Sequence, residues 1–217
     1  MIIAGAKGFA KELLEVLYRD YSYKEILFYD DITSGLPDIL YGRFGIIHNK
    51  KELGNALKKN AYFTLGVGVP KIRYQLNKLF IEKGGIIKTI ISNRATVGSF
   101  DTEIGEGCTI MDDVIITNNS RIKRGSLINT KTVIAHDTEI GMFTDVAPNV
   151  TISGNCRLGD YVSVGTGVII LPGVRIGNNV VIGAGSVVKN NIPDNSLVIG
   201  SPGKVIKTFK NLRFLNQ

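Results

Sequence analysis

An aliphatic residue recurs at every sixth position from Ile104 to Val188, and no position in this run is missed. A period of six does not fit an α-helix, because 3.6 residues per turn would rotate successive aliphatic side chains away from any one face. The run also lacks the regular turn signals that antiparallel hairpins require. The repeated positions are Ile104, Ile110, Ile116, Ile122, Ile128, Ile134, Ile140, Val146, Ile152, Leu158, Val164, Ile170, Ile176, Ile182 and Val188.

Each six-residue unit is interpreted as one short strand followed by a tight corner. Three such units close a triangular coil of about 18 residues, and coils stack at the strand spacing of ~4.8 Å. The repeated aliphatic side chains then point into the prism, while the small or β-branched residues two places before them fit beside the corners. Ile91 and Val97 extend the pattern upstream, with one residue inserted before Ile104. The repeat predicts a left-handed parallel β-helix, a handedness that departs from the usual rule for parallel strands.

Residues 1–85 have a different pattern, in which short apolar strands alternate with amphipathic helices. The expected strands are Met1–Ala4, Ile26–Tyr29 and Tyr62–Gly66, and the expected helices are Lys11–Arg19, Lys50–Lys59 and Ile72–Lys83. We therefore expect an α/β N-terminal Rossmann-like domain over residues 1–85. An all-β left-handed parallel β-helix follows over residues 86–217. Its basic tail after Gly203 is expected to be helical and to cap the open end of the prism.

The composition and net charge of the chain limit the classes of partner that it is expected to bind. The net charge of +7 suits polyanionic small molecules such as nucleotides and coenzyme A. The Lys and Arg residues are dispersed and no nucleic-acid-binding motif is present, so we expect no nucleic-acid partner. No apolar run approaches the ~20 residues that a bilayer requires, and the N-terminus lacks a signal-peptide pattern. We expect a cytoplasmic protein without a membrane partner.

Two cysteines lie in small-residue positions of the repeat. Cys108 and Cys156 are separated by about 2.7 coils, which places them on different faces and too far apart along the axis for a disulfide. We interpret them as packing residues.

Two loops of the N-terminal domain have residues that could bind a ligand. The glycine-containing segment Gly5–Ala10 lies between a strand and a helix N-terminus, where backbone amides can bind a phosphate. It matches the dinucleotide-binding fingerprint only in part, so a structural turn and a ligand site both remain open. Asp30 and Asp31 follow the second strand, where acidic side chains often contact a ribose or base. A solvated turn is the alternative for this pair.

The candidate catalytic residue is His136. His48 lies in a polar segment typical of the surface, whereas His136 comes two residues after Ile134 and is expected at a corner with its imidazole pointing outward. Asp137 follows directly and can orient the ring and raise its basicity. Eighteen residues further on, Gly154 occupies the same corner, where its backbone N–H can stabilise an oxyanion. A base and an amide donor on adjacent coils favour acyl transfer.

Two histidines are too few for a zinc site of about three histidine ligands, so no metal is expected.

These residues carry a resemblance to a known family. The hexapeptide array, the segment Asn129–Asp137 and the closing Gly-Ser-Pro-Gly-Lys-Val-Ile resemble the hexapeptide-repeat acyltransferases. The Gly5–Ala10 loop and Phe28-Tyr29-Asp30-Asp31 resemble, more closely, the PglD/NeuD subgroup of bacterial sugar acetyltransferases. The resemblance spans essentially the whole chain.

The resemblance implies a homotrimer that binds acetyl-CoA between neighbouring prisms and a nucleotide-linked amino sugar against the N-terminal domain. The implied reaction is N-acetylation of a 4-amino group in glycan or lipopolysaccharide biosynthesis. The counterpart of His136 is then the general base, and Asp137 increases its basicity. The implied substrate-binding residues are Lys7, Gly8, Phe9, Asp30, Asp31, Gly68 and Asn129, and the implied acetyl-CoA-binding residues are Asp145, Gly154, Thr166 and Ala184.

Two positions depart from the family pattern, because Phe9 and Asp145 stand where some members carry a histidine. The first departure bears on sugar specificity, and the second on a polar contact to the thioester end of the coenzyme.

Two alternative functions also remain at this point. One is an O-acetyltransferase that acts on sialic acid or another saccharide hydroxyl, since the same base can serve either nucleophile. The other is a non-catalytic β-helix scaffold.

Overall fold

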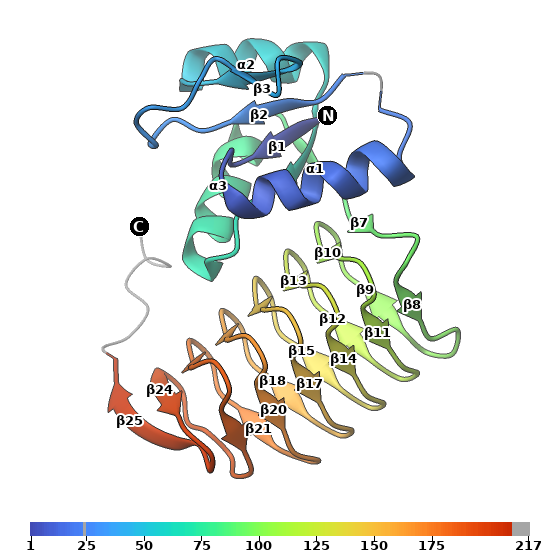
Figure 1. Cartoon of the computed structure of the whole chain (residues 1–217), viewed down its shortest axis with the longest axis vertical. Coiled ribbons are helices and arrows are strands. Elements are labelled where there is room, and N and C mark those ends of the chain that lie inside the picture. The colour runs from blue at the N-terminus through green and yellow to red at the C-terminus, as the bar shows by residue number, and fades with distance from the viewer. Residues whose placement is uncertain (24, 210–217) are drawn as a thin grey trace.

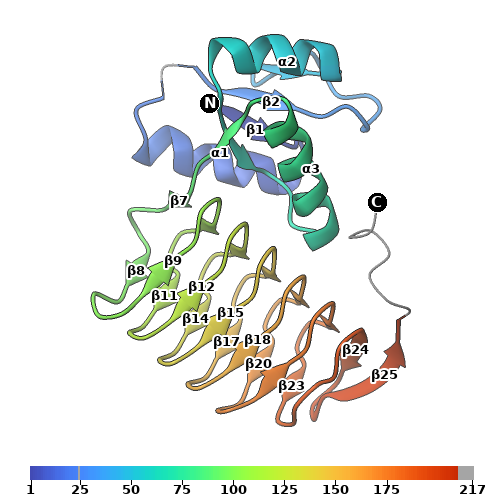
Figure 2. The same cartoon turned by 180° about the vertical axis from the view of Figure 1, so that it is seen from behind.

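A computed structural model describes residues 1–23 and 25–209 of the chain. Figure 1 shows a small α/β unit, formed by the N-terminal part of the chain, packed beside a long triangular prism. Helices α1 and α3 lie nearest to the prism, and α2 lies farthest from it. Seen from behind in Figure 2, the coils of the prism stack in one direction from the green strands to the red ones.

The α/β unit has a six-stranded sheet in the order β3-β4-β2-β1-β5-β6, parallel except for the β3–β4 pair. Buried apolar side chains of α1 pack against one face of this sheet, and those of α2 and α3 pack against the other. The elements are β1 (Ile2–Ala4), α1 (Gly8–Asp20), β2 (Leu27–Tyr29), β3 (Ile39–Leu40), β4 (Phe44–Ile47), α2 (Lys50–Lys59), β5 (Tyr62–Leu65), α3 (Pro70–Glu82) and β6 (Ile86–Ile87).

The prism has three faces, each a sheet of short strands, and we number them in the order in which the chain visits them. The first face contains β7 (Ile90–Ile91), β10 (Thr109–Ile110), β13 (Leu127–Ile128), β16 (Asp145–Val146), β19 (Ser163–Val164), β22 (Val181–Ile182), β24 (Ser196–Ile199) and β25 (Lys204–Thr208). The second contains β8 (Thr96–Val97), β11 (Ile115–Ile116), β14 (Val133–Ile134), β17 (Thr151–Ile152), β20 (Ile169–Ile170) and β23 (Val187–Val188). The third contains β9 (Glu103–Ile104), β12 (Arg121–Ile122), β15 (Glu139–Ile140), β18 (Arg157–Leu158) and β21 (Arg175–Ile176). We call the turns after these faces the first, second and third corners.

The strand register confirms the hexapeptide interpretation. Ile110 pairs with Ile128 and Ile128 pairs with Val146, so residues 18 apart lie on adjacent coils. Ile91 pairs with Ile110, a separation of 19, which confirms the inserted residue upstream of Ile104. The repeated aliphatic side chains form one continuous buried core inside the prism. Removing them from water is the main stabilising contribution to the prism, about 1.5–3 kcal/mol for each fully buried side chain. Cys108 and Cys156 are both free and buried, as expected.

The corners explain the polar residues of the repeat. One residue at most corners has φ between 49° and 60°, a left-handed conformation that Asn, Asp and Gly adopt at the lowest cost. Hydroxyl groups beside the corners join one coil to the next. Ser126 Oγ, for example, donates to the carbonyl of Gly141 at 2.7 Å, and Thr144 Oγ1 donates to that of Gly159 at 3.0 Å. The small-residue positions therefore satisfy buried carbonyl groups as well as fit the available space.

Two parts of the structure differ from the sequence expectation. The helix expected in the tail is wrong for the described residues, because Lys204–Thr208 forms β25, an antiparallel partner of β24. Val205 and Ile206 are β-branched and favour an extended strand, and this strand extends the last coil on the first face only. The hairpin β3–β4 was not expected, because its apolar runs are short. Residues 210–217 of the expected tail lie outside the described residues.

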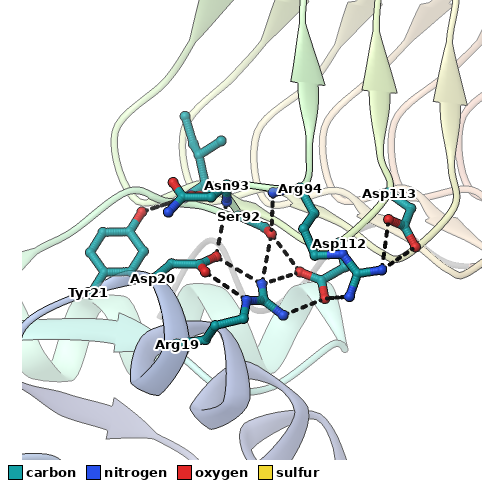
Figure 3. Close-up of polar contacts among 9 residues, drawn as sticks. Arg19, Asp20, Tyr21, Ser92, Asn93, Arg94, Asp112 and Asp113 are labelled. Atoms are coloured by element: carbon teal, nitrogen blue, oxygen red, sulfur yellow. Dashed lines mark hydrogen bonds and ion pairs between the residues drawn. The ribbon is translucent and has the colours of Figure 1, made fainter.

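Polar side chains fix the α/β unit to the first coils of the prism (Figure 3). At the end of α1, Arg19 donates to both carboxylate oxygens of Asp112, at 2.9 and 2.7 Å, and to both of Asp20, at 2.7 and 2.9 Å. Asp20 accepts from the backbone N–H of Asn93 at 3.0 Å. Because Arg19 comes from α1 and Asp112 from the first corner, this network sets the orientation of the two units.

A second contact between the units is aromatic. Tyr74 of α3 meets Phe143 edge-on at a centroid distance of 5.4 Å and Tyr161 at 5.9 Å, while Phe143 and Tyr161 stack at 6.0 Å. Both prism residues occupy left-handed corner positions, with φ of 49° and 58°. Bulky residues are unusual there. The third corner thus carries strained aromatic residues at the place where α3 packs.

Candidate active site

His136 lies at the second corner, between β14 and β15. Its ring points outward and its side chain is 62% exposed, as the corner position predicts. Nδ1 lies 2.6 Å from Oδ2 of Asp137. This contact fixes a proton on Nδ1 and leaves Nε2 available as a proton acceptor.

Asp137 is held from two sides. Its backbone has φ 58°, and the amide of Asn119, one coil away, donates to its Oδ1 at 3.3 Å. The hydrogen bond from His136 and then that from Asn119 lower the pKa of Asp137 below its ordinary value. Asp137 is therefore ionised over the whole range in which an imidazole can act as a base.

Gly154 lies against the imidazole on the adjacent coil. A Cβ atom at this position would be 2.6 Å from Cε1 and 2.7 Å from Nε2 of His136, so only glycine leaves the ring in place. The carbonyl of His136 accepts from the N–H of Asn155 at 2.9 Å. Within the described residues, no backbone carbonyl accepts from the N–H of Gly154. The second corner therefore presents a base beside an unused amide donor.

A wide groove reaches this corner along the third face. It has a volume of about 790 Å³ and is lined by Asp137 and Asn155 and by the charged side chains that point outward from the third face. The outward side chains of that face are Glu103, Arg121, Glu139, Arg157 and Arg175.

The expected substrate loops lie on the α/β unit. Lys7 and Gly8 are exposed at the N-terminus of α1, and Phe9 is half-buried against the cluster that joins α1 to the prism. Asp31 is exposed. Asp30 is buried, and its carboxylate accepts from the backbone N–H groups of Ile32 and Thr33 at 3.3 and 2.9 Å. Asp30 thus orders the loop after β2, whereas the exposed Asp31 interacts with the Tyr29 hydroxyl and, after burial, helps to raise the pKa of that tyrosine.

Gly68 and Asp145 lie side by side where the two units meet. A Cβ atom on Gly68 would be 3.1 Å from Oδ2 of Asp145. The resemblance assigns Gly68 to the sugar and Asp145 to the coenzyme, and the structure brings the two positions together. Arg73 of α3 is also at this junction, with its side chain fully buried. Sequence reasoning missed Arg73, because an arginine in an amphipathic helix gives no signal of burial.

The remaining predicted residues lie at the first corner. Asn129 is buried there, with its Oδ1 accepting from the N–H of Thr130 at 2.8 Å. Thr166 and Ala184 are exposed on adjacent coils, joined by a bond from Gly185 N–H to the Thr166 carbonyl at 2.9 Å. In one chain the whole second face separates this corner from His136. The structure therefore does not bring the first-corner residues and the base together within a single chain.

Residues 1–23 and 25–209 contain no cluster of three or more His, Cys, Asp or Glu side chains placed to hold a metal ion. The same part of the chain has no helix of the length and apolarity that would span a membrane.

Comparisons with known proteins agree with this architecture. A family model described as the PglD N-terminal domain matches residues 1–79, and one described as bacterial transferase hexapeptide (six repeats) matches residues 155–190. A search of the curated proteins gave no match.

Several solved structures are similar over almost the whole chain. The acetyltransferase domain of PglB from Neisseria gonorrhoeae is 31% identical, with a TM-score of 0.86, and the match covers 94% of this chain and 98% of that one. A mutant form of the perosamine N-acetyltransferase from Caulobacter crescentus, in complex with CoA and GDP-perosamine, is 25% identical with a TM-score of 0.86 and coverage of 95% and 96%. WeeI from Acinetobacter baumannii is 25% identical with a TM-score of 0.84 and coverage of 94% and 98%.

The N-terminal family match, the hexapeptide match and the full-length likeness to these acetyltransferases agree with the fold. The chain belongs to the PglD-type hexapeptide-repeat sugar acetyltransferases.

Proposed function

We propose that the protein transfers the acetyl group of acetyl-CoA to the 4-amino group of a nucleotide-linked amino-deoxy sugar, with His136 as general base. The observation that carries this proposal is the second corner. There Asp137 holds Nδ1 of the imidazole at 2.6 Å, and the Gly154 backbone lies against the same ring. The C. crescentus enzyme, which was solved with CoA and GDP-perosamine, supports the choice of substrates.

The reaction follows from these positions. His136 Nε2 removes one N–H proton as the amine nitrogen attacks the thioester carbonyl carbon and forms the C–N bond. The Gly154 N–H donates to the oxyanion that develops on the carbonyl oxygen. The C–S bond then breaks, and the imidazolium returns its proton to the leaving thiolate. Base catalysis contributes roughly 10²–10⁴-fold and one oxyanion donor about 10²–10³-fold.

We further propose that the active enzyme is a homotrimer in which two copies complete each site. His136 lies at the second corner, whereas Asn129, Thr166 and Ala184 lie at the first corner, across the second face. The outward side chains of that face carry no charge, and Ile115 and Ile169 are each 41% exposed. An apolar face between the two halves of a site is suited to packing against a second copy. Acetyl-CoA would then lie between the second corner of one copy and the first corner of its neighbour.

We place the reaction in the cytoplasm and in glycan biosynthesis. The free, buried thiols of Cys108 and Cys156 are typical of a compartment in which thiols stay reduced.

We also propose that the chain divides in function near residue 85, into an acceptor-binding unit and an acyl-transferring prism. In the structure, β6 still pairs with β5, and the first strand of the prism is β7.

The test is thiol release from acetyl-CoA in the presence of UDP-, dTDP-, GDP- and CMP-linked sugars with an amino or a hydroxyl group at the reacting position. We expect turnover with one nucleotide-linked amino sugar. His136→Ala should reduce kcat by about 10²-fold or more and leave the Kd of coenzyme A nearly unchanged. Near-normal turnover of this variant would exclude His136 as the base. Transfer to hydroxyl sugars alone would replace N-acetylation with O-acetylation.

Gly154→Ala provides a second arm of the same test. The added methyl group must displace the imidazole, and the ring can swing outward because it is exposed. We expect an unchanged Tm and a kcat lower by about 10²-fold, since a misplaced base and donor no longer act together. A variant with normal kcat would show that this corner takes no part in the reaction.

A further inference from the structure

The junction between the two units contains a pair of charged side chains, a buried arginine and a half-buried aspartate, that the proposed mechanism does not use. Arg73 is 0% exposed. Its Nε donates to the Gly125 carbonyl of the prism at 2.9 Å, and its Nη1 donates to the carbonyls of Leu65 and Val67 at 3.2 and 2.6 Å. Leu65 and Val67 lie just before Gly68. One guanidinium therefore ties the loop after β5 to the third corner of the prism.

The facing charge is Asp145. Its side chain points outward from the first face, where the residues in register with it are Leu127 on one side and Ser163 on the other. Along this face the outward residues are Ile90, Thr109, Leu127, Asp145, Ser163, Val181 and Leu197. From Ile90 to Leu197 Asp145 is thus the single charged side chain of the column, which continues on β25 with Lys207 beside Leu197. Asp145 lies directly beneath Gly68.

Both charged groups keep unused hydrogen-bonding capacity. Within the part of the chain that the structure describes, Nη2 of Arg73 has no hydrogen-bond partner, and no hydrogen bond contributes to the pKa of the half-buried Asp145 carboxylate. Buried polar groups in native proteins are almost always paired, so unpaired ones point to a bound ligand or water. An ionised Asp145 carboxylate can accept hydrogen bonds but cannot donate one. Its ligand must therefore be a hydrogen-bond donor, and a cationic donor binds it most strongly.

We propose that Asp145 binds the amino group of the acceptor sugar and selects an amine over a hydroxyl, and that Arg73 is the positioning residue that holds this carboxylate and the Gly68 loop together. The inference rests on the proposed function. An ammonium group forms a hydrogen bond with the carboxylate in which both partners are charged, whereas a hydroxyl donates to the same carboxylate as a neutral group and gains no ion pair. The extra proton of the ammonium leaves to water before attack. Asp145 then accepts one N–H bond and directs the nitrogen lone pair away from itself.

The electrostatics agree with this role. Burial raises the pKa of Asp145 to about 6, and the nearby charge of Arg73 limits the rise. The carboxylate is therefore ionised at neutral pH and can pair with a cation. Arg73 is the charged group that faces it from α3, while β13 and β19 present Leu127 and Ser163 and the loop presents Gly68.

The test compares Asp145→Asn with the wild-type enzyme, using the best amino sugar of the screen above and its hydroxyl counterpart as an inhibitor. The substitution keeps the shape of the side chain and removes its charge. We expect the KM of the amino sugar to rise about 10- to 100-fold, the preference for the amino over the hydroxyl compound to fall by a similar factor, and the KM of acetyl-CoA to stay unchanged. In the wild type, the KM of the amino sugar should also rise below pH about 6. Asp145→Asn should lose this dependence.

Ser163→Ala, one coil further along the same face, is the matched control and should alter none of these values. Arg73→Lys should weaken the same preference while the KM of acetyl-CoA holds. If Asp145→Asn instead raises the KM of acetyl-CoA and keeps the amine preference, the carboxylate serves the coenzyme and the inference is wrong. A wild-type enzyme that acetylates no amino sugar would defeat the proposed function itself, which is a separate outcome.

Discussion

At the scale of single residues, Asp137 has two roles that the structure allows to be separated. The residues at the same corner on neighbouring coils are Asn119, Asn155 and Gly173, and all have positive φ, as Asp137 does. The backbone at this corner therefore accepts Asn, Asp or Gly equally well. What distinguishes Asp137 is its carboxylate against Nδ1 of His136.

Asp137→Asn is expected to fold as the wild type does and to lose activity. The amide retains the left-handed corner but not the negative charge that favours the imidazolium, so kcat should fall by roughly 10-fold or more, within the 10²–10⁴-fold that the base supplies. Thermal melting and steady-state kinetics measure the two effects. Asn195→Asp, at another left-handed position with φ 59° and outside the groove, is the control and should change neither. An unchanged kcat in Asp137→Asn would limit Asp137 to a backbone role.

At the scale of residues, the sequence predicts which side chains lie together wherever the six-residue repeat sets their positions. A spacing of 18 residues places Gly154 beside His136, and the structure has them in contact. The cluster of Arg73 and Asp145 is different, because its contacts join residues far apart in the chain and follow no local period. The aromatic residues Phe143 and Tyr161 did carry a signal, since they stand at corner positions where Asn, Asp or Gly is expected.

At the scale of elements, the end of α1 is fixed to the prism by charge-assisted hydrogen bonds. Arg19 holds Asp20 and Asp112 together, and the Asp20 side chain is only 4% exposed. The hydrogen bond from Arg19 is the largest cause that lowers the pKa of Asp20 to about 2, and it also lowers the pKa of Asp112. Such bonds contribute about 1.5–3 kcal/mol each when both partners are well placed.

Arg19→Met should lower the free energy of unfolding at neutral pH by about 1–3 kcal/mol. Because the folded pKa of Asp20 lies below its unfolded value near 3.8, the stability that this carboxylate contributes is complete above pH about 4 and is lost as the pH falls toward 2. The difference between wild type and variant should therefore shrink over that window.

Urea unfolding at a series of pH values measures this difference. Arg121→Met is the control, because Arg121 pairs with Glu103 at 3.6 Å on an exposed surface and should contribute little. A difference between wild type and Arg19→Met that does not change with pH would show that packing, and not the ionised carboxylates, holds α1 in place.

Elements were predicted well where one local pattern decides them and poorly where pairing decides them. Helix α2 has the predicted bounds, Lys50–Lys59, because its amphipathic period and the Asn49 cap agree. Strand β25 was expected as a helix because its charge suggested one, yet its partner β24 supplies the backbone hydrogen bonds of a strand. The hairpin β3–β4 likewise depends on partners that a single-residue pattern does not reveal.

At the scale of the whole molecule, the proposed site draws its base from one copy and its acceptor loop from another. The two halves can therefore be inactivated in different chains. His136→Ala removes the base, and Gly68→Val fills the space in front of Asp145. In a trimer containing both variants, one of the three sites combines an intact base with an intact acceptor loop.

Mixed trimers isolated through two different affinity tags should recover about a third of the wild-type activity, whereas each variant alone should be nearly inactive. The activity is measured as thiol release from acetyl-CoA. Separately purified homotrimers that are mixed without exchange are the control and should stay inactive. If mixed trimers remain inactive, base and acceptor loop act within one chain and the proposed arrangement is wrong.

The aromatic contact of α3 with the third corner involves Phe143 and Tyr161, which lie on two successive coils of the prism. Each coil bonds to its neighbours, so a unit of 18 residues could be added after the coil that carries Ala184 without moving His136 or the Gly68 loop. The number of terminal coils is therefore free to vary among related chains, and natural length differences should fall there in steps of one turn of the prism.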